Sequence, residues 1–384
     1  MNLFKTFKYE AKQIFTDTAI VLTIIGGVIL YAFLYPQPYA AQSVSALGVS
    51  VVDYDKSDVS RSIVFKLDAT PQIRVARNDL SQKDAQEALL KGEVKAIIII
   101  PKDFKRDLAL HKSPTIAVGA DSSYFLIYGG VLEGAMKSVL THAATIKVAN
   151  LLKREVPLVA AKESYVPFSL NTINLFNKNN SYTQYVVPAV FVLILQQTML
   201  IGLGILGGGV NEKLARREEE YFNTAPIWQM YLSRIIIFMA IFFVHMLFYF
   251  GFVFEYFEVT RLADISDLLT FGFAFLLATI SFGLFLGSLF SSREIATPVV
   301  LFSSLPLVFS AGFVWPLESL PTLIHYLSLF VPSTPAIQGF LSLNQMGADF
   351  TMIIDSYALL YLQSMGYLFL ASIIFFKRRR AVCG

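Results

Sequence analysis

Six long apolar segments constrain this chain more than any other feature of its sequence. The hydrocarbon layer of a bilayer is about 30 Å thick, so a helix that crosses it needs roughly 20 apolar residues. Apolar residues make up 55% of the 384 residues and charged residues only 15%, whereas about a quarter of an average soluble domain is charged. We therefore expect a polytopic α-helical membrane protein with six transmembrane helices: Thr18–Tyr35, Val186–Val210, Ile235–Phe257, Leu268–Phe290, Thr297–Trp315 and Met352–Phe376.

Lys and Arg are distributed unevenly among the segments between these helices. If the N-terminus lies inside, the inner segments carry twelve of them, the two short outer loops carry one, Arg261, and the outer segment 316–351 carries none. Because Lys and Arg of short loops stay on the cytoplasmic side, both termini are predicted to lie in the cytoplasm and residues 36–185 outside a bacterial inner membrane. The twelve inner residues are Lys5, Lys8, Lys12, Lys213, Arg216, Arg217, Arg234, Arg293, Lys377, Arg378, Arg379 and Arg380.

Both ends of the chain are predicted to lie at the cytoplasmic surface of the membrane. Residues 1–17 have a helical pattern with an apolar face, which is typical of an amphipathic helix in the membrane interface. This pattern favours a retained anchor at residues 18–35 over a cleaved signal peptide, although the basic N-terminal region would also fit the latter. Residues 377–384 form a basic tail. The predicted apolar face consists of Leu3, Phe4, Phe7, Ala11, Ile14 and Phe15.

The stretch between the first two apolar segments, residues 36–185, has a different composition and holds 18 of the 31 Lys and Arg residues. Short β-branched runs alternate here with helical patterns, which predicts a periplasmic α/β domain that ends in a long helix. About 150 residues are enough for a domain to bury its own core. The predicted strands are Val49–Val52, Ile73–Ala76, Ala96–Ile100 and Thr115–Val118, and the predicted helices are Ser57–Leu67, Ser81–Lys91, Asp103–Leu110 and Tyr124–Glu155.

Glycine spacing in two apolar segments predicts close helix packing. Gly204 and Gly208 are four residues apart in the second segment, and Gly283 and Gly287 repeat this spacing in the fourth. Small residues at such positions let helix backbones approach each other. Residues 202–207 also match the dinucleotide fingerprint G-x-G-x-x-G by letter, but they lie inside a membrane segment and not at a strand-to-helix turn. A packing interface is the better interpretation.

The sequence lacks the usual motifs of catalysis and cofactor binding. It contains no G-x-x-x-x-G-K-[ST] loop, which is the usual cradle for a nucleotide phosphate. It shows no nucleophile–base pair and no His, Cys or acidic cluster with metal-ligand spacing. We therefore expect no catalytic residue, no metal and no bound cofactor in this chain, and no nucleic-acid partner.

His245 lies near the middle of the third apolar segment. An ionisable group at that depth is a candidate functional residue, for example in a proton relay. No acidic residue lies at the centre of another apolar segment. A buried neutral histidine that hydrogen-bonds to another helix is therefore the simpler interpretation, and a relay is the alternative.

Residues 211–234, between the second and third apolar segments, combine dense charge with aromatic residues and a break at Pro226. A solvated loop is the simple interpretation, but a shorter loop would be enough to join two helices. Charge beside aromatic residues suits docking into a groove of a soluble partner. We expect Tyr221 and Phe222 to be the apolar anchors of this contact, and their alanine variants to fold normally.

Several of these residues carry a resemblance to a known family. The segment 211–234 resembles the first inner loop of the permease subunits of ABC-2 type exporters, because Glu220, Pro226 and Arg234 fall where that family has a glutamate, a proline and a basic residue. It departs from the family at Arg217, where many members have glycine. The stretches Ser181–Pro188, Ser310–Pro321, Pro332–Pro335 and Leu343–Gly347 resemble other signatures of the family, and the last two those of a Gram-negative branch that is often paired with a periplasmic adaptor.

The resemblance implies a six-span half-transporter that pairs with a second copy or a close paralogue within membrane lipid. A cytoplasmic ABC ATPase would bind ATP and magnesium and drive it. Residues 316–350 would form short re-entrant helices at the outer end, where Trp315, Pro316 and Glu318 would line the rim of the path. The residues assigned to the ATPase-coupling loop are Glu212, Glu218, Glu219, Glu220, Tyr221, Phe222, Pro226 and Arg234.

Two other functions are compatible with a membrane protein that carries a large outer domain. A receptor would need a signalling domain inside, but the largest inner piece has only about 24 residues. An ion-coupled secondary transporter would need charged residues within its membrane segments and usually internal repeats, and neither is visible. The sequence therefore favours the permease, although it does not name the exported substrate.

Overall fold

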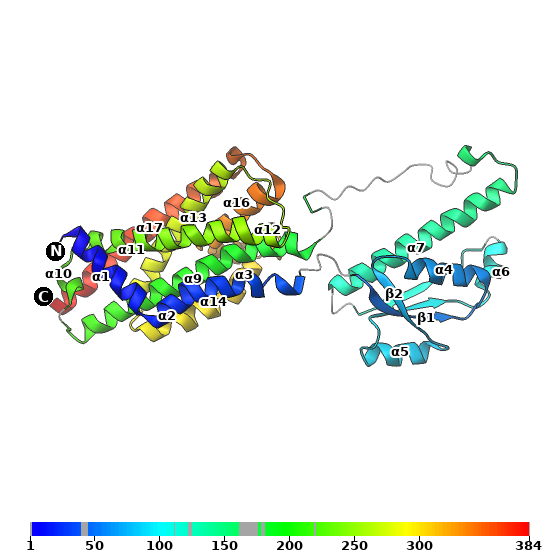
Figure 1. Ribbon diagram of the computed structural model, residues 1–384, viewed down its shortest axis with the longest axis horizontal. Coiled ribbons are helices and arrows are strands. Elements are labelled where there is room, and N and C mark those ends of the chain that lie inside the picture. The colour runs from blue at the N-terminus through cyan, green and yellow to red at the C-terminus, as the bar shows by residue number, and fades with distance from the viewer. Residues whose placement is uncertain are drawn as a thin grey trace. The chain divides into compact units, whose positions relative to one another are not determined.

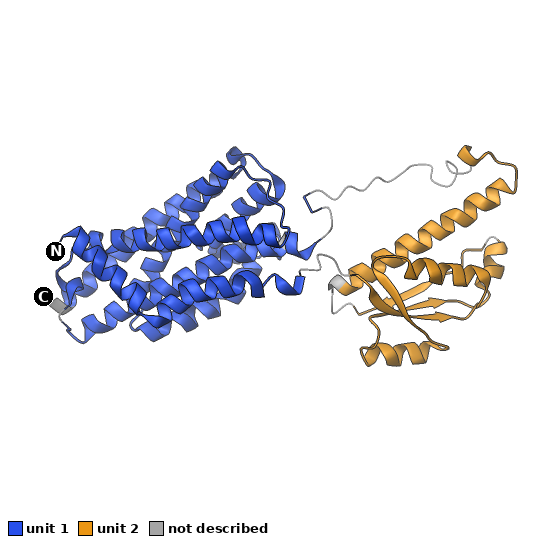
Figure 2. Cartoon of the chain, viewed as in Figure 1, with its two compact units in different colours: residues 1–42, 174–384 blue, residues 43–173 orange. Residues whose placement is uncertain are grey.

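The computed structural model describes residues 2–39, 45–110, 112–121, 125–160, 176–177, 181–218 and 220–383. The chain forms two compact units (Figure 2). Unit 1 comprises Met1–Gln42 and Asn174–Gly384, and unit 2 comprises Ser43–Ile173. Each unit has a hydrophobic core of its own.

Unit 1 is helical, and its described residues include six helices that are long and apolar enough to cross a membrane: Thr18–Tyr39, Val186–Ala215, Ile227–Tyr256, Ile265–Leu289, Arg293–Ser310 and Phe350–Ala381. The first follows α1 (Leu3–Thr16) and consists of α2 (Thr18–Val21), a π-helical stretch and α3 (Val28–Leu34). The others are formed mainly by α9 (Tyr182–Ala215), α11 (Ile227–Leu247) with α12 (Phe254–Tyr256), α13 (Ile265–Leu289), α14 (Ala296–Ser310) and α17 (Ile354–Cys383). These helices make the chain a multi-pass membrane protein (Figure 1).

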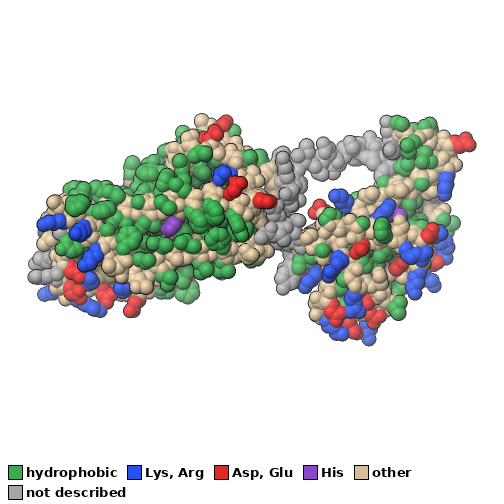
Figure 3. Space-filling model, viewed as in Figure 1, with side chains coloured by type: hydrophobic (Ala, Val, Ile, Leu, Met, Phe, Trp, Pro, Cys, Tyr) green, Lys and Arg blue, Asp and Glu red, His purple; other side chains and the backbone are tan. Residues whose placement is uncertain are grey.

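Helix α9 lies at the centre of unit 1. In its most apolar stretch 89% of the residues are buried, against 67% for α13 and 17% for α14. It contacts the first span, α11, α13, α14, α16 (Ser333–Met346) and α17. The outer helices keep exposed apolar side chains, and hydrophobic side chains cover much of the face of unit 1 that Figure 3 shows.

Several helix ends differ from those predicted from the sequence; among them, α17 continues to Cys383 instead of Phe376. Helix α9 continues to Ala215, and α11 begins at Ile227, so the irregular connection between them is only residues 216–226. Helix α14 ends at Ser310 instead of Trp315. The reason for that early end is Gly312, whose φ of +85° lies in the left-handed region that a continuing helix cannot use.

The segment after α14, for which the resemblance implies short re-entrant helices, contains two α-helices among its described residues. They are α15 (Thr322–Ser328) and α16, which starts after Pro332 and ends at Gly347 with a φ of +64°. Helix α16 is largely buried against α9, α13 and α17. It is therefore part of the packed core of unit 1.

Unit 2 is built on a four-stranded sheet with the order β2-β1-β3-β4. Strands β1 (Leu47–Asp53), β2 (Ile73–Asn78) and β3 (Ala96–Ile100) are parallel, and β4 (Ala117–Ala120) runs antiparallel to β3. The strands alternate with α4 (Asp58–Asp68), α5 (Gln82–Leu90), α6 (Phe104–Ala109) and the long α7 (Phe125–Leu152), as the sequence predicted.

The two faces of this sheet are covered by different helices (Figure 1). Alternate residues of a strand point to opposite faces. Val49 and Val51 therefore pack with α4, α6 and α7, whereas Val52 packs with α5. Local capping fixes two of these helices: the Ser57 hydroxyl accepts from the Ser60 amide at 3.1 Å and the Ser81 hydroxyl from the Asp84 amide at 3.2 Å.

Candidate functional site

One end of unit 1 gathers its charged residues, as Figure 3 shows at the end where both termini lie. We call it the polar end and define it as α1, the connection 216–226, the turn 290–295 and the last turns of α17. Four parts of the chain that are far apart in sequence meet there. The contacts among them are described next.

Helix α1 presents a polar stripe to the rest of unit 1. Thr6, Glu10 and Ile14, which are spaced four residues apart, are its buried residues. Of the apolar face predicted from the sequence, Ile14 is buried and Phe7 and Ala11 pack against the core of unit 1, whereas Leu3, Phe4 and Phe15 are exposed. The stripe is buried because α11 supplies matching polar groups: the Thr6 hydroxyl donates to Gln229 Oε1 at 3.2 Å.

A buried ion pair joins α1 to α11. Nε of Arg234 lies 2.9 Å from Oε2 of Glu10, and the two side chains are only 4% and 0% exposed. Within the described part of the chain, Glu10 Oε1 and Arg234 Nη2 have no hydrogen-bond partner. A pair of charges this deep is costly to remove from water and costlier still to break. It locks the start of α11 to α1.

The connection 216–226 is held against α1 by its own polar residues. The Tyr221 hydroxyl donates to Gln13 Oε1 at 3.2 Å, and the Tyr221 ring stacks on Tyr9 at 5.4 Å. Glu220 pairs with Lys213 at 2.6 Å and accepts from Gln13 Nε2 at 3.5 Å. Burial, together with the nearby negative charge of Glu10, raises the pKa of the Tyr221 hydroxyl far above its usual value, so Tyr221 stays neutral.

Of the two predicted apolar anchors of this connection, Phe222 does not lie on the surface. The short helix α10 (Tyr221–Thr224) turns Phe222 into the hydrophobic core, where its side chain is fully buried. Tyr221 is partly covered by α1. The expectation that both residues face a partner and can be replaced by alanine without loss of stability is therefore wrong for Phe222, because its removal would leave a cavity in the core.

The exposed part of the connection is the turn after α9. Arg217 has a φ of +58°, its amide donates to Leu214 O at 2.9 Å, and the Glu218 amide donates to Lys213 O at 3.1 Å. This pair of bonds is the Schellman arrangement, in which the residue at the position of Arg217 is left-handed and usually glycine. Arg217 and Glu218 are exposed, Glu212 pairs with Arg216 at 2.5 Å, and Glu219 lies outside the described residues.

Basic side chains tie the other segments of the polar end together. Arg293 forms an ion pair with Asp17 at 2.8 Å, and Asp17 also caps α2. From the end of α17, Arg378 donates to Phe290 O at 3.0 Å and Arg379 donates to Ala225 O at 2.7 Å. These bonds use carbonyl groups that the ends of helices leave free.

The four predicted packing glycines lie where α9 meets its neighbours. A Cβ at Gly204 would lie 2.9 Å from Ala296 Cβ, and one at Gly208 would lie 2.4 Å from Ser292 O. Gly283 and Gly287 face Leu203 of α9. The sequence interpretation missed Gly207, where a Cβ would lie 2.7 Å from backbone atoms of Gly287. This glycine pair is a direct backbone contact of α9 with α13.

The other predicted site residues are dispersed. His245 is buried in α11 beside the ring of Phe242, and its Nδ1 finds no hydrogen-bond partner among the described residues. Trp315, Pro316 and Glu318 are exposed after α14, at the end of that helix remote from Arg293. Pro226 immediately precedes α11 as its N-cap.

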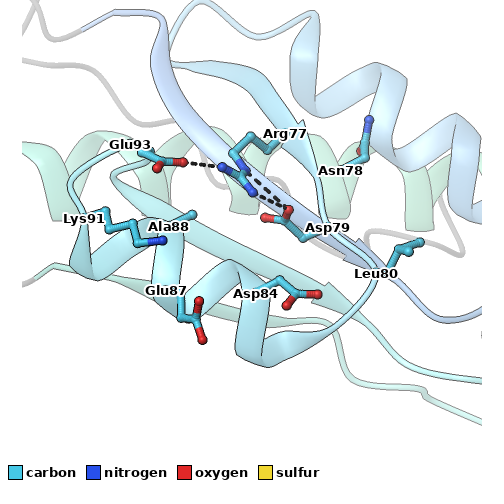
Figure 4. A pocket seen from close by; sticks show the side chains of 9 residues that line it. All are labelled: Arg77, Asn78, Asp79, Leu80, Asp84, Glu87, Ala88, Lys91 and Glu93. Carbon is cyan, nitrogen blue, oxygen red and sulfur yellow. Dashed lines mark hydrogen bonds and ion pairs between the residues drawn. The ribbon is translucent and has the colours of Figure 1, made fainter.

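Unit 2 carries a polar pocket beside β2 and α5 (Figure 4). Arg77 bridges Asp79 and Glu93 across it. Hydrogen bonds from Arg77 and then from Ser50 hold the pKa of the Asp79 carboxyl below its usual value. Because Arg77 at its centre pairs with both Asp79 and Glu93, we interpret this pocket as a solvated ion-pair cluster. Among the described residues, no three His, Cys, Asp or Glu side chains are grouped as metal ligands.

The chain matches a known protein family. Residues 18–376 match the family described as ABC-2 family transporter protein. The matched range includes the first five candidate spans and most of the sixth, together with all of unit 2, and it begins just after α1. No curated protein matches the chain.

Proposed function

Since this chain belongs to the ABC-2 family of transporter proteins, we propose that it is the membrane-spanning permease subunit of an ATP-driven exporter. A separate cytoplasmic ABC ATPase would bind and hydrolyse ATP, because the sequence has no phosphate-binding loop of its own. One observation supports this proposal in addition to the family match. At the polar end, hydrogen bonds and a buried ion pair connect the exposed turn 216–218 through α1 to a membrane span.

The proposed coupling route runs from the turn 216–218 through α1 into α11. Glu220 and Tyr221 attach the connection to Gln13 of α1. Glu10 of α1 then holds Arg234, which lies inside the third candidate span. A displacement of the turn by a partner would therefore move α1 and α11 together, since neither Glu10 nor Arg234 can be left unpaired at low cost.

We further propose that two copies, or this chain and a close paralogue, form the substrate path. The centre of unit 1 is filled by α9, so a path through one copy would have to displace its most buried helix. A path along the outer helices of two copies avoids that cost. The exposed apolar side chains of α14, among them Phe302 and Leu305, offer such a surface.

The bias of Lys and Arg supports an orientation with the polar end in the cytoplasm and unit 2 in the periplasm of a Gram-negative bacterium. In that orientation unit 2 is available to a periplasmic adaptor. The test is a pair of reporter fusions. A fusion after Pro114 should be active only outside the cytoplasm and one after Gly384 only inside, and activity of both on the same side would overturn the orientation.

The coupling proposal is tested by reconstituting the chain with its ABC ATPase in lipid nanodiscs, with co-purification and ATP hydrolysis as readouts. Glu218→Lys should weaken the association about tenfold, or ~1.4 kcal/mol, because Glu218 is exposed on the turn. Glu318→Lys is the matched control, since Glu318 is equally exposed but follows the remote end of α14. Equal losses in both variants, or a wild-type chain that binds no ATPase, would overturn the proposal.

A further inference from the structure

Unit 2 contains an apolar groove that its fold does not fill. The groove has a volume of about 510 Å³, within the range of ligand pockets, and lies on the face of the sheet that α4, α6 and α7 cover. Ile116 and Val118, from β4 and the residues just before it, form one wall, and Met136 and Leu140 of α7 form another. Phe104 of α6 lies among the remaining lining residues. Met136 and Leu140 are both more than half exposed.

One buried polar atom belongs to this otherwise apolar wall. His142 lines the groove and is 8% exposed. Its Nδ1 lies 2.9 Å from Nζ of Lys66, which donates to it, so the neutral ring carries its proton on Nε2. Burial and the Lys66 charge lower the pKa of His142, which keeps it in this neutral form. Within the described residues Nε2 has no hydrogen-bond partner.

The groove therefore offers an N–H donor where the chain provides no acceptor. A buried donor without a partner costs about 1–3 kcal/mol, and a ligand oxygen at this place would remove that cost. Positive charge lies close by: Lys66 contacts His142, and Lys112 lines the groove, with Asp107 at a long 3.7 Å. An anionic oxygen fits this environment better than a neutral one.

We propose that this groove binds a long-chain fatty acid. Its alkyl chain would lie between β4 and α7 against Val118, Met136 and Leu140, and its carboxylate would accept from His142 Nε2 near Lys112. A single chain suits a groove of this volume, whereas a lipid with two chains would leave the second outside. A long alkyl chain also matches a wall that is mostly apolar, since among the described residues that line it only Lys112, Ser113 and His142 have polar side chains. The site stands independently of the proposed transport function.

The experiment uses the full chain in lipid nanodiscs and a palmitate that carries a photoreactive diazirine. After irradiation, mass spectrometry should locate cross-links in residues 132–146 of α7 and in β4, besides the background labelling of the spans. Unlabelled palmitate should compete with this labelling at least fivefold better than hexadecanol, which has the same chain without the charge. In His142→Leu this preference should fall to within twofold.

A matched pair of variants guards against misfolding. Leu140→Glu places a charge in the groove at an exposed position, and labelling of unit 2 should fall at least fivefold. Leu90→Glu makes the same change at an exposed position of α5, on the other face of the sheet, and should leave labelling within twofold of the wild type. Labelling confined to the spans, or equal in both variants, would overturn the proposal. So would a change of oligomeric state in Leu140→Glu without loss of labelling, because the groove would then be an interface between copies.

Discussion

Glu10 and Arg234 are 224 residues apart in the sequence, yet their side chains meet at 2.9 Å in the interior of unit 1. The pair is incompletely satisfied, because one oxygen of Glu10 and one nitrogen of Arg234 lack a partner among the described residues. Such a pair contributes little net stability, while the loss of one member leaves a buried charge alone. Because breaking the pair costs much more than forming it gains, the pair holds α1 and α11 together.

The asymmetry gives the first prediction. Glu10→Gln should lower the thermal denaturation midpoint of the purified chain strongly, with a cost of about 3–5 kcal/mol, because Arg234 keeps its charge without a counter-charge. The double variant Glu10→Gln/Arg234→Met should be more stable than the single variant, since it removes both charges. A double variant that is as unstable as Glu10→Gln would show that the cost comes from packing and not from charge.

The second prediction concerns the left-handed residue after α9. Arg217→Gly should stabilise the chain by about 1 kcal/mol, because a residue with a side chain is strained at φ +58° and glycine is not. Arg216→Gly is the control: Arg216 has a φ of −78°, so glycine there relieves no strain, adds unfolded-state entropy and removes the ion pair with Glu212, and it should destabilise the chain. Denaturation midpoints measured side by side distinguish the two variants, and a gain in both would contradict the strain argument.

The third prediction tests the contact of α9 with α13. Gly207→Ala should destabilise unit 1 by about 1–3 kcal/mol, because the added methyl would meet the backbone of Gly287 at 2.7 Å and force the helices apart. Gly209→Ala lies two residues further along the same helix, where the nearest atom is Arg293 Cβ at 4.0 Å. That variant should be neutral or slightly stabilising, since alanine is the better helix former. Equal midpoints would disprove the close contact.

The fourth prediction concerns pH. The pKa of His142 in the folded chain is lower than its unfolded value of about 6.5, so the unfolded state binds the proton more readily. The stability of unit 2 should therefore be highest above pH 6.5 and fall as the pH drops below it. Hydrogen exchange of β1 and β3 amides at pH 7.5 and 5.5, corrected for intrinsic rates, measures this.

The same measurement on two variants identifies the cause. His142→Gln should remove most of the extra loss of protection at pH 5.5, because no group with a lowered pKa remains at this position. Lys66→Met should reduce the loss without abolishing it, since burial is the larger cause of the shift and Lys66 the smaller. A wild-type chain whose protection is the same at both pH values would refute the assignment.

The spans and the sheet could be predicted because their signals are local. Ala96–Ile100 was predicted with the bounds of β3, since a β-branched run closed by Pro101 leaves little choice. The start of the third span was placed too late because Arg234 ends the apolar run. In the structure Arg234 lies inside the helix, where Glu10 compensates its charge. The sequence predicts a strand at Thr115–Val118, two residues before the observed β4. The position of β4 depends on its pairing with β3, which a local pattern does not show.

The candidate site could be predicted only in part. The charge and the aromatic residues of the segment 211–234 are visible in the sequence, but nothing in a local pattern shows that Phe222 turns inward. Glu10 lies in an amphipathic helix among exposed lysines, and its partner is more than two hundred residues away. The pairs of glycines four residues apart drew attention to Gly204 and Gly208, whereas the contact with Gly287 belongs to Gly207. The burial of Phe222, the pairing of Glu10 and the contact of Gly207 all depend on segments that are distant in the sequence, which a local pattern does not reveal.

The central position of α9 determines which amino-acid substitutions each span can tolerate in evolution. A residue of α9 has protein neighbours on every side, so even an exchange between Leu and Phe alters the packing of several helices. The rest of the chain buries only 17% of the span that contains α14, so in a membrane lipid would cover most of it, and lipid accepts any apolar side chain of suitable length. Homologous chains should therefore retain the residue sizes along α9 and diverge along α14. Positions of α14 that resist such drift would mark where another protein touches it.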